Sequence, residues 1–126
     1  RQQPRVIVLL TMVFLLALVL PACVKSKIEN KGTLKKLYKV YKSGVISECK
    51  YKGETVYSAG LNAYDAGGAV YDKNGMQLGT CNYAWGVADS ICAQLTDCEV
   101  IYRVKNNIWG EASVDKYGLG KLCWVP

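Results

Sequence analysis

Histidine is absent from the 126-residue chain, and phenylalanine occurs once. The lack of histidine excludes Ser-His-Asp and Cys-His nucleophile systems, histidine general acid–base catalysis and histidine metal ligands. The sequence also lacks a phosphate-binding loop, a dinucleotide fingerprint, a nucleophile elbow and a CxxC pair. The length suffices for one small domain. We therefore expect a single domain that is not an enzyme and holds no cofactor.

An uncharged, largely apolar run extends from Val6 to Leu20 after Arg1 and Arg5. A membrane-spanning helix needs about twenty apolar residues, so this run is short, and its basic start and small-residue exit are typical of a secretory signal. The exit, Leu20-Pro21-Ala22-Cys23, resembles the bacterial lipobox, although Pro21 departs from the usual small residue. The resemblance implies a signal peptide over residues 1–22 and lipidation of Cys23. Plain secretion and an uncleaved anchor are the alternatives.

Lysines gather just after this segment. Residues 24–52 contain nine lysines and two glutamates, whereas residues 53–126 contain five basic and eight acidic residues. The lysines indicate either a solvated tether and exposed face or attraction to anionic lipid headgroups. Because they form no recognisable nucleic-acid-binding motif, no nucleic-acid partner is expected. The expected location is the cell envelope, with the protein anchored by its N-terminal lipid on the periplasmic or extracellular side of a membrane.

Residues 23–32 are polar and without periodicity, which predicts a tether after the lipidated cysteine, and residues 33–126 are expected to form one globular domain. Apolar residues at helical spacing predict a helix from Leu34 to Tyr41, capped by Thr33, with a strand as the alternative. Beyond it the pattern is mainly that of strands. The expected strands are 45–51, 54–59, 69–72, 76–81 and 99–104.

Short turns join these strands into hairpins, at Lys52-Gly53 and at Lys73-Asn74-Gly75. A short helix is expected from Ser90, with Asp89 or Ser90 as its cap, and the last predicted strand has Val100 and Tyr102 on the same side. These elements predict an α+β fold, a small antiparallel β-sheet of hairpins with one or two short helices, supported by disulfides.

Disulfides are expected because an exported small domain with several cysteines folds in an oxidising compartment. Lipidation of Cys23 would leave five candidates, which are Cys49, Cys81, Cys92, Cys98 and Cys123. We predict a Cys49–Cys81 bridge, because both residues fall in predicted strands, and pairing of Cys92 with Cys98 or with Cys123. No metal site is expected, because tightly spaced cysteine pairs are absent.

Three predicted loops carry aromatic side chains, at Tyr64, Trp85 and Trp109. Tyrosine and tryptophan must supply much of the core of a domain without phenylalanine, so packing in the core is the first expectation for Trp85 and Trp109. Aromatic loop residues also anchor protein partners, because they offer a large apolar contact area. Tyr64, Trp85 and Trp109 are therefore the candidates for contact with a partner.

Several short motifs between Cys49 and Tyr117 resemble a group of small uncharacterised bacterial lipoproteins. They read Cys49-Lys50-Tyr51, Asn62-Ala63-Tyr64-Asp65, Tyr71-Asp72-Lys73-Asn74-Gly75, Gly79-Thr80-Cys81-Asn82-Tyr83 and Asn107-Ile108-Trp109-Gly110. The resemblance covers about half the chain and implies a location in the cell envelope and no catalytic function.

The favoured hypothesis is a non-catalytic envelope protein that binds a protein or peptide. One alternative is a hydrolase that acts on a glycan through a carboxylate pair such as Asp65 with Asp72, which would have to converge in one cleft. Another is a secreted inhibitor, because the outline of hairpins and a helix is similar to small periplasmic β-lactamase-inhibitor-like domains.

Overall fold

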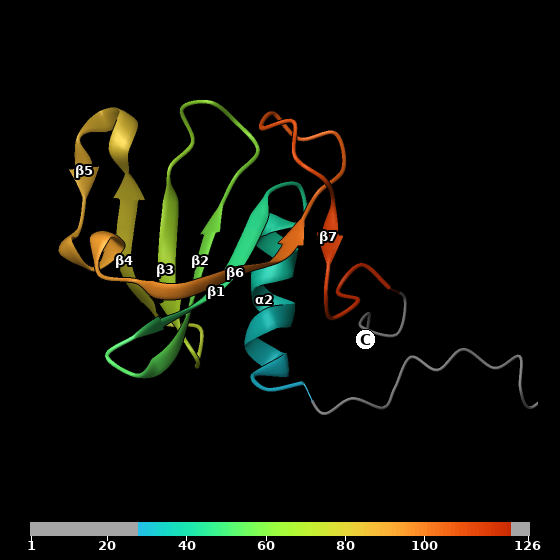
Figure 1. Ribbon diagram of the computed structural model, residues 1–126, viewed down its shortest axis with the longest axis horizontal. Helices are drawn as coiled ribbons and strands as arrows, with labels where there is room; N and C mark the ends of the chain where they lie inside the picture. Colours follow the sequence, from blue (N-terminus) through green and yellow to red (C-terminus); the bar gives the residue numbers. More distant parts are fainter. Residues whose placement is uncertain (1–27, 122–126) are drawn as a thin grey trace, which may run out of the picture.

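The computed structural model describes residues 28–121 (Figure 1). Over these residues the chain forms one α-helix and a seven-stranded antiparallel sheet, so the α+β prediction is confirmed in outline, with strand predominating. The expected signal peptide, the lipidation site Cys23, the first half of the tether and Cys123 lie outside the described residues. No helix within residues 28–121 is long and apolar enough to cross a bilayer. The elements are α2 (Lys31–Tyr41), β1 (Val45–Tyr51), β2 (Glu54–Gly60), β3 (Gly68–Asp72), β4 (Gln77–Asn82), η1 (Tyr83–Trp85), β5 (Val87–Ala88), η2 (Ser90–Ala93), β6 (Thr96–Arg103) and β7 (Val114–Asp115).

The strands follow the order β5-β4-β3-β2-β1-β6-β7 across the sheet. Both predicted hairpins are present: β1 pairs with β2 from Val45↔Gly60 to Tyr51↔Glu54, and β3 pairs with β4. After β5 the chain crosses to the far side of β1, where β6 pairs with it. Because neighbouring strands are antiparallel, β2, β4 and β6 run in the same direction. Their C-terminal ends therefore lie at the same end of the sheet, at the top of Figure 1.

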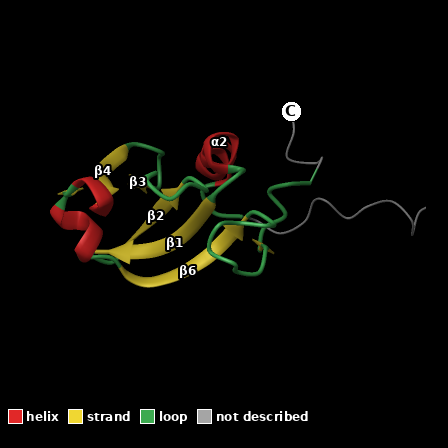
Figure 2. Cartoon of the chain, turned by 90° about the horizontal axis from the view of Figure 1, so that it is seen from above, coloured by secondary structure: helices red, strands yellow, loops and turns green. Residues whose placement is uncertain are grey.

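Helix α2 packs on one face of the sheet (Figure 2). Leu34, Leu37 and Tyr41 are buried on its inner side, and they pack in one core with sheet residues that include Ile46 and Tyr57. The helix begins at Lys31, so the prediction that Thr33 caps it is wrong. The Thr33 hydroxyl instead donates to the carbonyl oxygen of Lys73 at 2.7 Å, which fastens the helix to the β3–β4 turn.

Tyrosines supply much of this core, as the shortage of phenylalanine led us to expect. The hydroxyls of Tyr41 and Tyr71 lie 2.7 Å apart, and Tyr102 donates to the carbonyl oxygen of Lys42. Tyr38 packs edge-on against Tyr102, with ring centroids 5.2 Å apart. Burial raises the pKa of Tyr41 and, together with the nearby Tyr38, raises the pKa of Tyr102 to about 12.

A second core lies on the opposite face of the sheet. It contains Cys49, Val56 and Val70, which alternate along their strands with residues that face α2, and Ile91 from η2 covers them. The predicted short helix after Asp89 is the single 3-10 turn η2, which packs against this face of the sheet through Ile91.

Two disulfides hold this second core. Cys49 of β1 bonds to Cys98 of β6, and Cys81 of β4 bonds to Cys92 of η2. The predicted Cys49–Cys81 bridge is wrong: β2 and β3 lie between β1 and β4, so three strand spacings, about 14 Å, separate the two residues. A disulfide requires Cα atoms within about 7 Å. Both predicted partners of Cys92 are wrong, and the four cysteines that the structure describes are all paired.

Strand β6 departs from the predicted alternation. Val100 lies opposite Ser47, whereas Tyr102 lies opposite Ile46. Since Ser47 and Ile46 are consecutive and point to opposite faces of the sheet, Val100 and Tyr102 do so as well. The register shift between these pairs is a bulge at Ile101, which lets Ile101 and Tyr102 both enter the core beneath α2.

Candidate functional site

Three loops come together at the end of the sheet where β2, β4 and β6 finish. They are residues 61–67 between β2 and β3, residues 83–86 around η1, and residues 104–113 between β6 and β7. We refer to this surface as the loop end; it lies at the top of Figure 1. Each loop carries one of the three aromatic residues that the sequence singled out. Residues spread over 46 positions of the sequence therefore lie at the same end of the fold.

Specific hydrogen bonds tie the three loops together. The indole nitrogen Nε1 of Trp85 donates to the carbonyl oxygen of Asp65 at 3.3 Å, which joins η1 to the first loop. On the other side, the backbone N–H of Ile108 donates to Oδ1 of Asn62 at 2.8 Å. The loop of Tyr64 is thus held from both flanks.

Asn107 organises the third loop. Its side chain is 9% exposed, and its Nδ2 donates to the carbonyl oxygens of Val104 and Glu111 at 2.8 and 2.9 Å. Its Oδ1 accepts the N–H of Glu111 at 3.0 Å. One buried amide therefore closes residues 104–111 into a compact turn that presents Trp109. The sequence pattern predicts only that Asn107 ends a strand, although an asparagine in such a segment is a known signal of turns built on side-chain hydrogen bonds.

The aromatic residues of the loop end are exposed. The exposed fractions of Tyr64, Trp85 and Trp109 are 84%, 69% and 41%, so the expectation that the two tryptophans pack in the core is wrong. The core is built instead from aliphatic residues and from other tyrosines, such as Tyr57 and Tyr102. Leu61, Tyr83 and Val87 are also exposed at or beside these loops, so six of the nine exposed large hydrophobic residues in the described part of the chain lie here. Exposed large hydrophobic residues of the described part of the chain are therefore concentrated at the loop end, whereas those of most proteins are scattered singly.

The structure does not bring together the carboxylates Asp65 and Asp72. Asp65 precedes β3 and Asp72 ends it, so the length of that strand, about 13 Å, separates them. Asp72 shapes the β3–β4 turn, because its Oδ1 accepts the N–H groups of Asn74 and Met76 at 2.8 and 2.9 Å. The side chain of Asp89 makes no cap for η2 and accepts the N–H of Thr80 at 2.7 Å. These acids therefore serve turns and loops.

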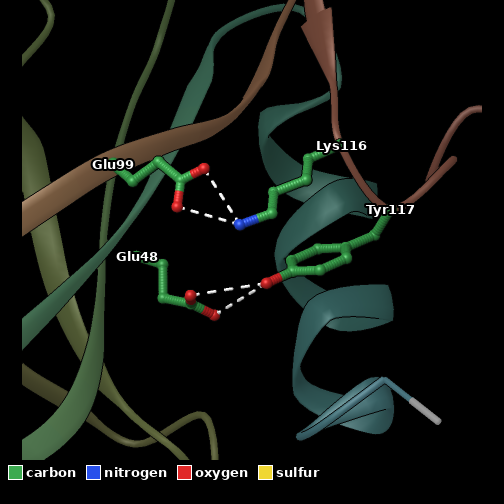
Figure 3. Close-up of polar contacts among 4 residues, drawn as sticks. All are labelled: Glu48, Glu99, Lys116 and Tyr117. Atoms are coloured by element: carbon green, nitrogen blue, oxygen red, sulfur yellow. Dashed lines mark hydrogen bonds and ion pairs between the residues drawn. The ribbon is translucent and has the colours of Figure 1, made fainter. Parts of the chain in front are cut away.

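A different carboxylate pair is present on the helix side of the sheet (Figure 3). Glu48 of β1 and Glu99 of β6 are direct register partners, a placement that brings like charges close together and destabilises the pair. Lys116 offsets this repulsion, because its Nζ lies 2.9 Å from both oxygens of Glu99. The Tyr117 hydroxyl donates weakly to Glu48, at 3.3 and 3.4 Å from its oxygens.

The electrostatics of this cluster follow from these contacts. The hydrogen bond to Glu99 raises the pKa of the exposed Lys116, so the ion pair favours the charged ammonium. Burial and the neighbouring Glu48 charge raise the pKa of Tyr117, which keeps its hydroxyl protonated as a donor. The cluster thereby fastens the segment after β7 against β1 and β6.

A shallow hollow of about 330 Å³ lies at the end of the sheet opposite the loop end. Its lining residues include Tyr51, Lys52, Glu54, Asp72 and Lys73. Asp72 is engaged in the turn described above, and Lys73 forms an exposed ion pair with Glu54 at 3.8 Å. Within residues 28–121, no group of three or more cysteine and acidic side chains is arranged to hold a metal ion.

Comparisons of the chain with known protein families, with curated proteins and with solved structures found no match.

Proposed function

We propose that this protein is an exported, lipid-anchored envelope protein without catalytic activity, and that the loop end binds a protein or peptide partner. The observation that carries the proposal is the meeting of Tyr64, Trp85 and Trp109 on one surface, exposed and held by hydrogen bonds between their loops. A rigid sheet that presents loops at one end is a common arrangement for binding, because the scaffold fixes loops whose side chains are free to make contacts.

The energetics of recognition favour these residues. Tyrosine and tryptophan supply large contact areas at a small cost in conformational entropy, and they are enriched among the residues that dominate binding energy. The hydrogen bonds between the loops restrict them before a partner binds, which further lowers the conformational entropy lost on binding. The two disulfides support an oxidising location, and Cys23 would supply the membrane anchor.

Site-specific photo-cross-linking in intact cells tests the loop end. Benzoylphenylalanine replaces Tyr64 in one variant and Met76 in a matched control, because Met76 is similarly exposed, at 67%, but lies in the turn at the opposite end of the sheet. We expect a cross-linked product from position 64 that is absent from position 76. Trp85→Ala should weaken the captured complex about 30-fold, as for a residue at the centre of an interface. Identical products from positions 64 and 76 would contradict the proposal.

The envelope location is tested separately by the intact mass of the mature protein. Removal of residues 1–22 and acylation of Cys23 are the expected modifications, and a reduced form retained in the cytosol would refute this part of the proposal.

A second candidate is hydrolysis of a glycan, and the observation in its favour is the register pairing of Glu48 with Glu99. Retaining glycosidases use two carboxyl groups about 5–5.5 Å apart. Activity on cell-wall glycan that disappears in both Glu48→Gln and Glu99→Gln, with the fold retained, would favour this candidate over pure binding.

A further inference from the structure

Lysines line the outer side of helix α2. Lys31, Lys35, Lys39 and Lys42 are spaced so that they fall within about 80° of one another around the helix axis, and we call them the lysine stripe. The buried residues of α2 lie on the other side of the axis, against the sheet. The stripe is therefore turned away from the body of the protein.

The charge of the stripe is not neutralised by the helix that carries it. Helix α2 contains no acidic residue. Within residues 28–121, Lys35, Lys39 and Lys42 form no ion pair, in contrast to Lys116, which is held by Glu99. Lysines four residues apart on a helix repel one another, which costs about 0.2–0.5 kcal/mol per pair. Lys35, Lys39 and Lys42 thus form a positive surface that gains no ion pair from the described part of the chain.

An exposed apolar side chain also lies near the lysine stripe. On the helix itself, Val40 is 59% exposed and lies toward the edge of the positive surface, next to the exposed Lys36. An exposed apolar residue beside lysines is typical of helices that lie in the headgroup region of a bilayer.

We propose that the lysine stripe docks on an anionic lipid surface, so that α2 lies flat against the membrane. The position of the proposed anchor supports this occupant, because Lys31 lies eight positions after Cys23, and an extended chain over eight positions spans at most about 28 Å. The inference rests on the proposed envelope location but not on partner binding at the loop end. Each lysine close to an anionic surface strengthens attachment about fivefold.

Lysine reactivity measured on lipid discs tests the proposal. The full chain is reconstituted in nanodiscs of phosphatidylcholine alone and in discs with about one third phosphatidylglycerol, and trace acetylation at each lysine is followed by mass spectrometry. We expect acetylation of Lys35, Lys39 and Lys42 to slow at least fivefold in the anionic discs, and high salt to restore the rates. Lys105, which is exposed at the loop end, is the internal control, and its rate should not change.

A charge-reversal variant, Lys35→Glu with Lys39→Glu, completes the test. Lys39 is exposed and Lys35 is half-buried, and neither makes a described ion pair, so the variant should fold, and the slowing at Lys42 should disappear. Equal rates in the two kinds of disc, or equal slowing at Lys42 and Lys105, would overturn the proposal. Failure here would leave the cross-link at Tyr64 unaffected, whereas failure of partner binding would leave the lysine rates unaffected.

Discussion

Substitution of Asn107 by alanine should release the third loop of the loop end while leaving the sheet intact. The change removes two donated bonds and one accepted bond that involve Val104 and Glu111. A hydrogen bond contributes about 0.5–1.5 kcal/mol net, and a buried group left without a partner costs more. The free energy of opening this loop should therefore fall by about 2–4 kcal/mol.

Amide hydrogen exchange measures that opening directly. The N–H of Glu111 bonds to Asn107, so in Asn107→Ala its exchange should accelerate about 30- to 1,000-fold, the factor that corresponds to 2–4 kcal/mol. The N–H of Met76, held by Asp72 at the other end of the sheet, reports whether the effect is local and should not change. Asn107→Asp keeps the acceptor for Glu111 and should give an intermediate rate. An unchanged rate at Glu111, or equal acceleration at Met76, would refute the assignment of Asn107 as the organiser of this loop.

Three further predictions concern the scaffold. Gly44→Ala should destabilise the fold by about 3 kcal/mol in urea denaturation, because a Cβ would lie 2.0 Å from the backbone oxygen of Gly60, whereas Gly60→Ala meets nothing closer than 3.8 Å and should cost far less. Replacing Cys81 and Cys92 by alanine should lower the free energy of unfolding by about 3 kcal/mol, the value expected for a bridge between residues 11 positions apart. An unchanged denaturation midpoint would contradict this. Because the pKa of Tyr102 is raised to about 12 in the folded state, its contribution to stability is fully present below pH 10 and is lost as the pH rises from 10 toward 12. Tyr102→Phe should therefore flatten the fall of the melting temperature over that range.

Local pattern was enough to predict the elements that depend on neighbouring residues. Strand β1 runs from Val45 to Tyr51 as expected, because its alternation and the Lys52-Gly53 turn are encoded within a few residues. The positive φ of both turn residues, 50° and 80°, shows why that dipeptide marks the hairpin so clearly. The loop aromatics were found in the same way, because glycine, asparagine and aromatic residues cluster locally.

What the sequence could not predict depends on contacts between distant segments. The crossing from β5 to β6 places Cys98 beside Cys49, and nothing local to either cysteine specifies that neighbour. The hydroxyl of Thr33 acts as a tertiary tie to Lys73, although its sequence position favours a helix cap. In both cases a long-range packing arrangement determines the partner, while propensity alone favours a local one.

The geometry of the fold also limits how the two proposed surfaces could work together. Helix α2 ends at Tyr41 and β1 begins at Val45, so the C-terminal end of the helix meets the loop end (Figure 1). A helix that lies flat on a membrane would therefore direct the loop end sideways along the bilayer surface, and the face that carries η2 would point away from it. A partner able to contact Tyr64 in that orientation must itself approach close to the lipid. If the stripe and the loop end are occupied at the same time, this constraint favours a membrane-associated protein over a freely diffusing peptide as the partner.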